Sequence, residues 1–298
     1  DGWYGVSLPT QIRLYEVAYA RYKNPLLLNT LQDCYRLEDR LSPEALLTNT
    51  TIHPDKELKE SESYLFGQTG YGVLRSGKKS VVLKYGPSGG GHGHPDKLSI
   101  SIHNGEKEIL PDLGTCAYGI PDYLNWYKRT LSHNTVTVDC KDQRPATGQM
   151  VYFDDHSIEA FCDKAYPGVE MKRKLLLKGD ILCDEFDCIS DTIHQYDYVL
   201  LLTEQPQIEG EFTGAKLDEA VAYKQIRNVK RSVMNHPFTV STPTGKITFR
   251  VDGVPSFELF VGEVSGIPPT NPDIVTKTGT ERRPVAVSYT HLRAHETR

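Results

Sequence analysis

The side chains most able to do chemistry gather in one glycine-rich stretch of the chain and just beyond it. His92 and His94 stand one residue apart behind a run of glycines, and Asp112 and His133 follow further along. Two histidines with one carboxylate form a common ligand set for zinc, with a position left open for water or substrate. Imidazole nitrogens favour zinc over calcium or magnesium. These residues therefore predict a zinc site, against the alternative that the histidines lie in turns and bind nothing.

The expected backbone geometry brings these groups together. In an extended segment, residues i and i+2 face the same side, so the first two histidines can enter one cavity. The glycines beside them permit unusual backbone angles and the close approach of a ligand. Asn104-Gly105 is a strong hairpin signal, which pairs residues 98–103 with residues 106–111. Asp112 is then expected near residue 97, within reach of the two histidines.

Most of the chain that carries this cluster is predicted to be β-structure. From about residue 48 the helical spacing ends and apolar residues alternate with polar ones. Ser76-Gly77 separates two such segments and is a further hairpin signal. The alternating segments are residues 71–75, 80–85, 98–103, 135–139, 172–178, 181–188, 196–203 and 247–251. Many short strands with no helices between them favour a mainly β fold built as an antiparallel β-sandwich.

The first part of the chain is different, because its apolar residues recur at helical spacing. Residues 7–22 predict one helix, Asn24-Pro25 ends it, and a second helix follows. Two short amphipathic helices cannot bury their apolar faces alone, so we expect partners in sequence upstream of this chain. We divide the chain into helices at 1–47, a sandwich at 48–286 and a tail at 287–298. The tail resembles a translated sequencing adapter, so its two histidines are left out of the site.

Bulk composition excludes several classes of protein. The chain has 298 residues and a net charge of −5, which argues against a nucleic-acid binder but allows a local basic patch for an anionic substrate. No apolar run approaches the roughly 18 residues that a membrane helix needs, and no signal peptide is visible. None of the six cysteines lies in a CxxC pair, so we expect free thiols rather than a zinc ribbon.

Three separated motifs resemble one family of enzymes. They are GGGHGHPDKLSI, LPDLGT and WYKRTLSHNTVTVDCKDQ, and they occur in the order found in the heparinase II/III-like polysaccharide lyases, which include the oligoalginate lyases. The resemblance covers roughly residues 60–280 and concerns the C-terminal sandwich of that family. It implies that an α/α toroid precedes the sandwich and that residues 1–47 are the last helices of the toroid.

The resemblance also implies roles for the clustered residues. His92 matches the active-site histidine of the family at the cleft between its domains. His94, Asp112 and His133 match the zinc ligands, and the zinc in these lyases is usually described as structural. The catalytic tyrosine of the family, with its partner histidine and asparagine, belongs to the toroid. Those positions fall upstream of Asp1.

The substrate class that this implies is an anionic oligo- or polysaccharide containing uronate. Its C5 hydrogen lies next to a carboxylate, which must be neutralised before a base can remove the proton. An acid then protonates the leaving oxygen at C4. His92 could act as base or as neutralising group. Tyr127 is the local tyrosine candidate for catalysis, with packing in the sandwich as the alternative role for its ring.

Further residues are assigned to binding and support. Lys97, Arg129 and Tyr123 are the candidates for contacting an anionic sugar. Asn134 and Gln143 are the candidates for orienting the metal ligands. Alginate, heparin or heparan sulfate and hyaluronan-type chains are all compatible substrates. A bacterial periplasm or cytoplasm would suit an oligosaccharide lyase, and the oligomeric state is left open.

Two other functions compete with the lyase. One is a non-catalytic carbohydrate-binding sandwich whose zinc is structural. The other is a zinc hydrolase that uses His94, Asp112 and His133 with an activated water, for which Asp96 is the candidate general base. A lyase product carries a double bond between C4 and C5 and absorbs in the ultraviolet, whereas the product of a hydrolase does not.

Overall fold

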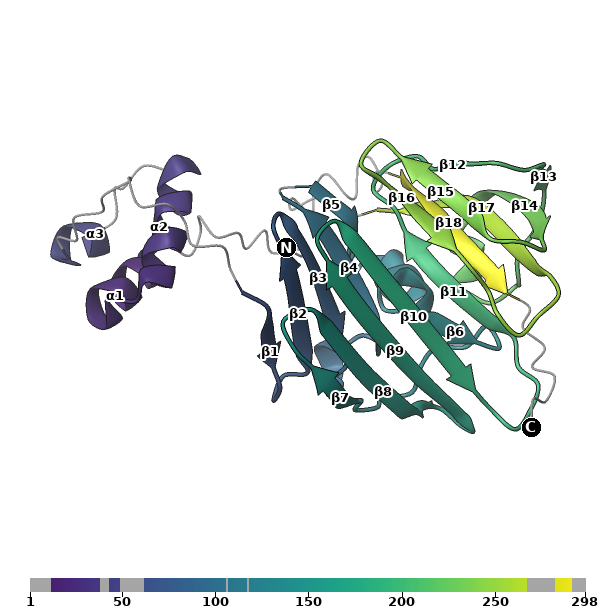
Figure 1. Ribbon diagram of the computed structural model, residues 1–298, viewed down its shortest axis with the longest axis horizontal. Coiled ribbons are helices and arrows are strands. Elements are labelled where there is room, and N and C mark those ends of the chain that lie inside the picture. Colours follow the sequence, from purple (N-terminus) through teal and green to yellow (C-terminus); the bar gives the residue numbers. More distant parts are fainter. Residues whose placement is uncertain are drawn as a thin grey trace. The chain divides into compact units, whose positions relative to one another are not determined.

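A computed structural model describes residues 12–37, 43–48, 62–105, 107–116, 118–266 and 282–290 of the chain (Figure 1). The chain divides into two compact units, Asp1–Ser61 and Glu62–Arg298. The first unit is helical and the second consists of β-sheets, as the sequence predicts. The boundary between the two units falls after Ser61, further along the chain than the expected domain boundary after residue 47.

The helical unit contains three described helices around a small core. They are α1 (Ile12–Tyr22), α2 (Pro25–Leu37) and α3 (Pro43–Thr48). The break at Asn24-Pro25 is confirmed, while α3 was not expected. Among the described residues of this unit, Ile12, Leu31 and Cys34 form a buried apolar cluster. Within the described parts of the chain, no helix is both long enough and apolar enough to cross a membrane.

The second unit begins with a five-stranded antiparallel sheet. Its strands follow one another in space as in sequence: β1 (Tyr64–Phe66), β2 (Tyr71–Ser76), β3 (Lys79–Lys84), β4 (Ser99–Asn104) and β5 (Lys107–Leu110). The hairpin at Ser76-Gly77 is confirmed, and Gly77 has the positive φ of +54° that such a turn requires. The hairpin at Asn104-Gly105 is also confirmed, with a bulge that shifts the register between Ile102 and His103.

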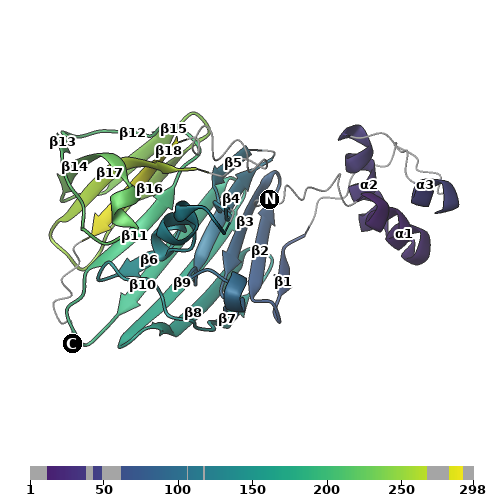
Figure 2. The same ribbon diagram turned by 180° about the vertical axis from the view of Figure 1, so that it is seen from behind.

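A four-stranded antiparallel sheet packs against the first one. Its order is β10 (Ile181–Ile189), β9 (Val169–Lys178), β8 (Ser157–Tyr166) and β7 (Gln149–Phe153). Figures 1 and 2 show the two sheets one behind the other from opposite sides. Gly72 in β2 makes room for this contact, because a Cβ there would lie 1.9 Å from Cδ1 of Ile158 in β8. The interface forms part of the main apolar core of the unit.

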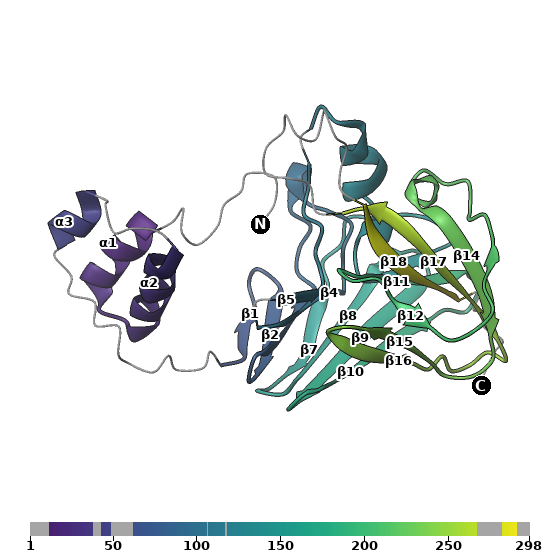
Figure 3. The same cartoon turned by 90° about the horizontal axis from the view of Figure 1, so that it is seen from above.

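A six-stranded antiparallel sheet and a small three-stranded sheet complete the unit. The larger has the order β13 (Thr213–Gly214), β14 (Arg227–Met234), β17 (Phe257–Ser265), β18 (Arg282–Thr290), β11 (Tyr196–Leu201) and β6 (Val136–Val138). The smaller consists of β12 (Gln207–Ile208), β15 (Phe238–Thr242) and β16 (Gly245–Phe249). Figure 3 shows these sheets beside the first pair. The mainly β, antiparallel fold predicted from alternation is therefore confirmed.

Strand β11 of the six-stranded sheet has buried residues on both of its faces. In β11, Leu200 belongs to the main core, while Val199 and Leu201 belong to a second core on the opposite side. Short helical turns cover that second side, among them Tyr123–Tyr127 and Tyr223–Gln225. The segment that carries His133 connects one of these turns to β6. The sheet thus provides a rigid support for the residues expected to form a site.

Candidate functional site

His92 lies on an exposed turn rather than in an extended segment. Residues Gly90–His92 form a single turn of 3-10 helix, and Gly90 has a φ of +61°. The loop closes tightly behind the turn, because a Cβ on Gly93 would lie 2.4 Å from the backbone nitrogen of Gly89. The expectation that His92 and His94 face one side of a strand is therefore wrong. The left-handed glycine turns the chain before His92, and the two imidazoles acquire different neighbours.

His94 faces His133. The centroids of the two rings are 5.2 Å apart, and His133 is only 1% exposed. Within the described residues, neither ring nitrogen of His133 has a hydrogen-bond partner. Burial, together with the neighbouring His133, lowers the pKa of His94 to about 4. His94 is therefore neutral at physiological pH, which is the form of imidazole that binds metals.

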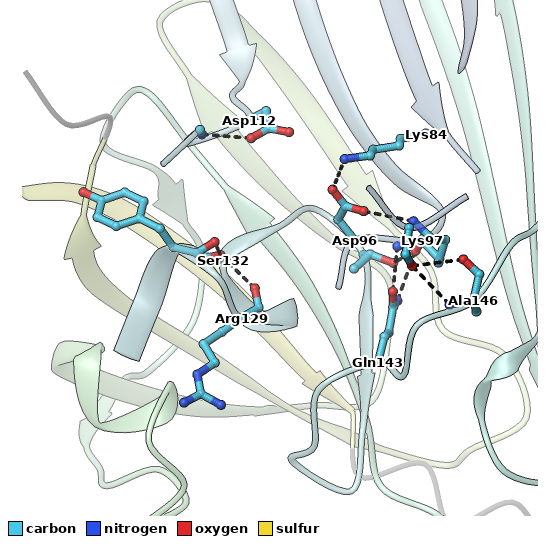
Figure 4. Close-up of polar contacts among 12 residues, drawn as sticks. Lys84, Asp96, Lys97, Asp112, Arg129, Ser132, Gln143 and Ala146 are labelled. Carbon is cyan, nitrogen blue, oxygen red and sulfur yellow. Dashed lines mark hydrogen bonds and ion pairs between the residues drawn. The ribbon is translucent and has the colours of Figure 1, made fainter. Parts of the chain in front are cut away.

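Two carboxylates lie beside this imidazole pair. Asp112 is exposed and accepts a hydrogen bond of 2.9 Å from the backbone of Gly114, and its charge acts on His94. Asp96 is buried and pairs with the ammonium groups of Lys84 and Lys97, the latter at 3.2 Å (Figure 4). Although burial acts to raise it, the neighbouring positive charges hold the pKa of Asp96 below its usual range.

These donors fit zinc in kind. Two adjacent imidazoles, one of them with both nitrogens buried and unpaired within the described residues, are an unusual arrangement unless a ligand satisfies them. A nearby carboxylate completes the set that zinc prefers. Within the described residues, however, no group of three or more His, Cys, Asp or Glu side chains is close enough to hold a metal ion as it stands. The structure thus places the imidazoles of His94 and His133 side by side without a complete set of metal ligands around them.

Two of the residues expected to support or contact a ligand, Lys97 and Gln143, are buried and hydrogen-bonded to each other. Lys97 is 1% exposed, and its backbone forms two hydrogen bonds with the side chain of Gln143. The backbone amide of Lys97 donates to Oε1 of Gln143 at 2.6 Å, and Nε2 of Gln143 donates to the carbonyl of Lys97 at 3.1 Å. Figure 4 shows this arrangement beside Asp96. Lys97 neutralises a buried acid, so its charge does not reach a substrate. Gln143 orients a backbone segment rather than a metal ligand.

Asn134 ties three segments together next to His133. Its side-chain amide donates to the carbonyls of Ile100 and Pro111, both at 2.9 Å, and its oxygen accepts from the amide of Leu201 at 2.7 Å. Asn134 therefore fixes the backbone that carries His133, and its amide forms no hydrogen bond with the ring nitrogens of His133. This indirect role differs from the expected one, in which its side chain orients a ligand.

Arg173 was missed by the sequence reasoning. It is fully buried in β9, and Nη1 donates to the carbonyls of Leu98 and Asn134 at 2.6 and 2.7 Å. Its other nitrogens bind the carboxylate of Asp184. A signal was available, because Arg173 occupies an inward-facing position in an otherwise apolar alternation. A cation at such a position requires a buried partner.

The aromatic candidates lie in the second core. Tyr127 is 0% exposed and donates to the carbonyl of Gly266 at 2.6 Å, while the indole of Trp126 donates to Ser265 at 3.0 Å. In the structure the ring of Tyr127 packs in this core, which is the alternative role that the sequence left open. Arg129 is paired with Asp142 at 2.8 Å.

The groups that contact the His92 loop are Tyr118 and Lys128. The hydroxyl of Tyr118 is hydrogen-bonded to Nδ1 of His92, and the two ring centroids are 5.8 Å apart. Lys128 donates from Nζ to the carbonyl of Gly91 at 2.6 Å. Tyr123 lies between them, with its ring edge-to-face with Tyr118 at 4.9 Å. The sequence analysis considered Arg129 as a sugar contact and did not consider Lys128. The sequence alone does not distinguish these two adjacent cations.

Comparison with known proteins identifies relatives of this arrangement. A family model described as heparinase II/III-like, C-terminal, matches residues 59–264, which is more than half of the chain. An exo-oligoalginate lyase from Saccharophagus degradans is 25% identical over 182 residues, covering 51% of this chain and 23% of its own. A heparin-sulfate lyase from Bacteroides stercoris is 30% identical over 118 residues, covering 36% of this chain and 18% of its own.

Solved structures share the fold. A heparan sulfate lyase from Pedobacter heparinus superposes with a TM-score of 0.63 at 14% identity, covering 97% of this chain and 40% of that one. A crystal structure of heparinase III superposes with a TM-score of 0.54 at 17% identity, covering 91% and 41%. The chain thus spans less than a quarter of the length of these curated relatives and about 40% of the length of the solved chains.

Proposed function

Because this chain belongs to the heparinase II/III-like family through its C-terminal region, we propose that it is the sandwich part of a polysaccharide lyase that cleaves uronate-containing glycans by β-elimination. The observation that carries the proposal is the exposed His92, held at Nδ1 by Tyr118 beside a buried pair of imidazoles. The names of its relatives, heparin-sulfate lyase and exo-oligoalginate lyase, support an anionic glycan as substrate.

The proposed chemistry assigns His92 to the uronate at the scissile bond. A base removes the proton from C5, the electrons of that bond form the C4–C5 double bond, and the C4–oxygen bond breaks. An acid then gives a proton to the leaving oxygen. Since Nδ1 of His92 is engaged by Tyr118, Nε2 is the nitrogen that can act on the sugar. It either donates to the carboxylate or accepts the C5 proton.

A zinc ion near His92 is part of the proposal. His94 and His133 would supply imidazole nitrogens, and Asp112 would supply a carboxylate oxygen after a local movement. When bound, the ion would supply a fixed positive charge that cross-links the loop after His92 to the segment before β6. The neutral state of His94 and the unpaired nitrogens of His133 support this assignment.

Two roles considered from the sequence are not carried into the proposal. Asp96 is 1% exposed and is held by Lys84 and Lys97, so it is a poor general base for a zinc hydrolase. Tyr127 contributes to packing and is fully buried. A carbohydrate-binding module without catalysis differs from the lyase only in turnover, so the same experiment separates the two.

The test measures unsaturated product and glycan binding together. Alginate, heparan sulfate and hyaluronan oligosaccharides are incubated with the 298-residue chain and with a version extended to the length of its curated relatives. We expect an ultraviolet-absorbing product from the extended protein, reduced at least about 100-fold by His92→Ala. His156→Ala, which alters an exposed histidine at the turn between β7 and β8, is the matched control. Cleavage without ultraviolet absorbance, or equal activity in both variants, would contradict the proposal.

A further inference from the structure

The loop that carries His92 has little packing to hold it in place. A Cβ built on Gly90 or Gly91 would meet nothing within 4 Å, so this part of the loop faces open space. Glycine also loses more conformational freedom on ordering than any other residue. The loop is closed by a hydrogen bond of 3.1 Å from the amide of Gly93 to the carbonyl of Gly90. Its position relative to the rest of the site must therefore come from side chains outside it.

Lys128 supplies one of those contacts. Its ammonium donates to the carbonyl of Gly91 at 2.6 Å, one residue before His92. The same nitrogen lies 3.3 Å from the hydroxyl of Tyr123 and 5.5 Å from the centroid of that ring. Tyr123 is 8% exposed and packs edge-to-face on Tyr118, the residue that holds the imidazole itself. Lys128 and Tyr118 thus hold backbone and side chain at the same point of the loop.

The electrostatic environment of Lys128 also differs from that of Lys97 and Arg129. Lys97 is paired with Asp96, and Arg129 is paired with Asp142. In the part of the chain that the structure describes, no carboxylate forms an ion pair with Lys128. Its contacts are a carbonyl, a hydroxyl and an aromatic face, which satisfy hydrogen bonds but leave the net charge uncompensated. A carboxylate of an anionic glycan next to His92 would meet that charge.

We propose that Lys128 is a positioning residue for His92, which fixes the glycine loop through the carbonyl of Gly91 and makes the surface beside the imidazole selective for anionic sugars. The inference rests on the proposed function and names a residue that determines its specificity. A charge-assisted hydrogen bond is about twice as strong as a neutral one, so a single contact of this kind is enough to order a short loop.

The experiment compares Lys128→Met, Lys128→Arg and Lys172→Met with the unaltered chain. Lys172 is a partly exposed lysine on β9 that is paired with Glu159, and serves as the control. Amide hydrogen exchange of Gly91 and His92 reports on the loop. Calorimetric binding of a trisaccharide of alginate, at low and at high salt, reports on the site. An uncharged trisaccharide of the same size tests selectivity.

We expect Lys128→Met to speed exchange of these amides and to weaken trisaccharide binding by about tenfold each, equivalent to the loss of about 1.4 kcal/mol. The salt dependence of binding should fall with the lost charge. Lys128→Arg should restore both to within about threefold, because the cation is kept. A merely structural residue would not change salt dependence or distinguish charged from uncharged sugar.

One result would overturn the positioning role of Lys128, and another would overturn the proposed function. If Lys128→Met behaves like Lys172→Met in exchange and in binding, the positioning role is overturned. If the unaltered chain binds no uronate sugar, yet exchange at Gly91 still rises in Lys128→Met and recovers in Lys128→Arg, the positioning role stands. The proposed function is then what fails.

Discussion

Among the described residues, His133 has two buried ring nitrogens without a hydrogen-bond partner. A buried histidine normally gives each ring nitrogen a partner, and within the described residues His133 has none for either. Its neighbour His94 is kept neutral by burial. Leaving both nitrogens of one ring bare costs stability, since a buried polar group without a partner is destabilising by about 1–3 kcal/mol. A cation shared by the two rings would remove that cost.

We therefore predict that the purified chain contains about one zinc, and that a chelator lowers its melting temperature because the metal binds only the folded state. His94→Ala should abolish the zinc, whereas His103→Ala, on the partly exposed strand β4, should keep it. Metal analysis with thermal melts before and after chelation is the measurement. A folded sample of the unaltered chain that contains no zinc and melts equally with chelator would rule out this site.

Asp197 provides a second prediction at the level of one residue. It is 0% exposed and accepts hydrogen bonds from Tyr223 at 2.5 Å, Thr137 at 3.2 Å and Gln195 at 3.1 Å. Burial nonetheless raises its pKa from 3.8 to about 6. Between those two values the folded chain holds a proton that the unfolded chain has released, so this group adds stability as the pH falls through about 6 and stops adding below 3.8.

The expected effect is a gain of about 1 kcal/mol in the free energy of unfolding between about pH 7 and about pH 5, where one pKa unit corresponds to about 1.4 kcal/mol. Urea unfolding at both values measures it. Asp197→Asn cannot titrate and should lose this gain whatever its overall stability. Carboxylates with a lowered pKa, such as Asp139, lose their contribution to the free energy of unfolding only at a pH below this range. An identical pH slope in the variant and the unaltered chain would refute the assignment.

At the scale of elements, one arginine connects the two packed sheets to the site. Arg173 in β9 reaches the carbonyl of Leu98, just before β4, and the carbonyl of Asn134, just before β6. Leu98 has a φ of +60°, which is uncommon for a residue with a side chain and needs support from its surroundings. The guanidinium provides that support, and Asp184 neutralises its charge.

We predict that Arg173→Met lowers the free energy of unfolding by about 3–5 kcal/mol, because it leaves the carboxylate of Asp184 uncompensated in a partly buried site. Lys172→Met, one residue earlier, changes a surface ion pair and should cost no more than about 1 kcal/mol. The double change Arg173→Met with Asp184→Leu should recover part of the loss. Urea unfolding compares all three, and equal stabilities for the two single variants would contradict the role.

Much of this arrangement of elements follows from the sequence alone. Alternation predicted the strands, because a sheet with one face in the core repeats every second residue, as in β9. Asn104-Gly105 predicted its hairpin because few residue pairs adopt that turn readily. The glycine run failed as a guide, since glycine is equally compatible with an extended segment and with the left-handed turn that Gly90 adopts.

The sequence predicted one contact of the candidate site and left most of the others open. The family resemblance named His94 and His133 as ligands of one metal, and the structure places their rings side by side. Which tyrosine would be buried could not be deduced, since the burial of Tyr127 and the exposure of Tyr118 depend on the tertiary core that forms around Tyr127. The pairing of Lys97 with Asp96 depends on tertiary burial, which no local pattern encodes.

At the scale of the whole molecule, the end of the chain joins the largest sheet. Strand β18 lies between β17 and β11, and its last four residues, Val287–Thr290, pair with Val199–Tyr196 on one side. Val287–Tyr289 pair with Phe260–Glu258 on the other side. These same residues begin the stretch that the sequence identifies as an adapter-derived tail. A strand in the interior of a sheet leaves two rows of backbone groups unpaired if it is removed.

Chains that end at different residues test whether those four positions belong to the fold. We predict that a chain ending at Thr290 unfolds with the same free energy as the full chain. A chain ending at Ala286 should lose several kcal/mol, since each unmade backbone hydrogen bond costs on the order of 1 kcal/mol. Urea unfolding of both is the measurement. If the chain ending at Ala286 is as stable as the one ending at Thr290, the sheet does not require residues 287–290 and the adapter assignment gains support. A large loss would mean that these residues, whatever their origin, complete the six-stranded sheet on which the site rests.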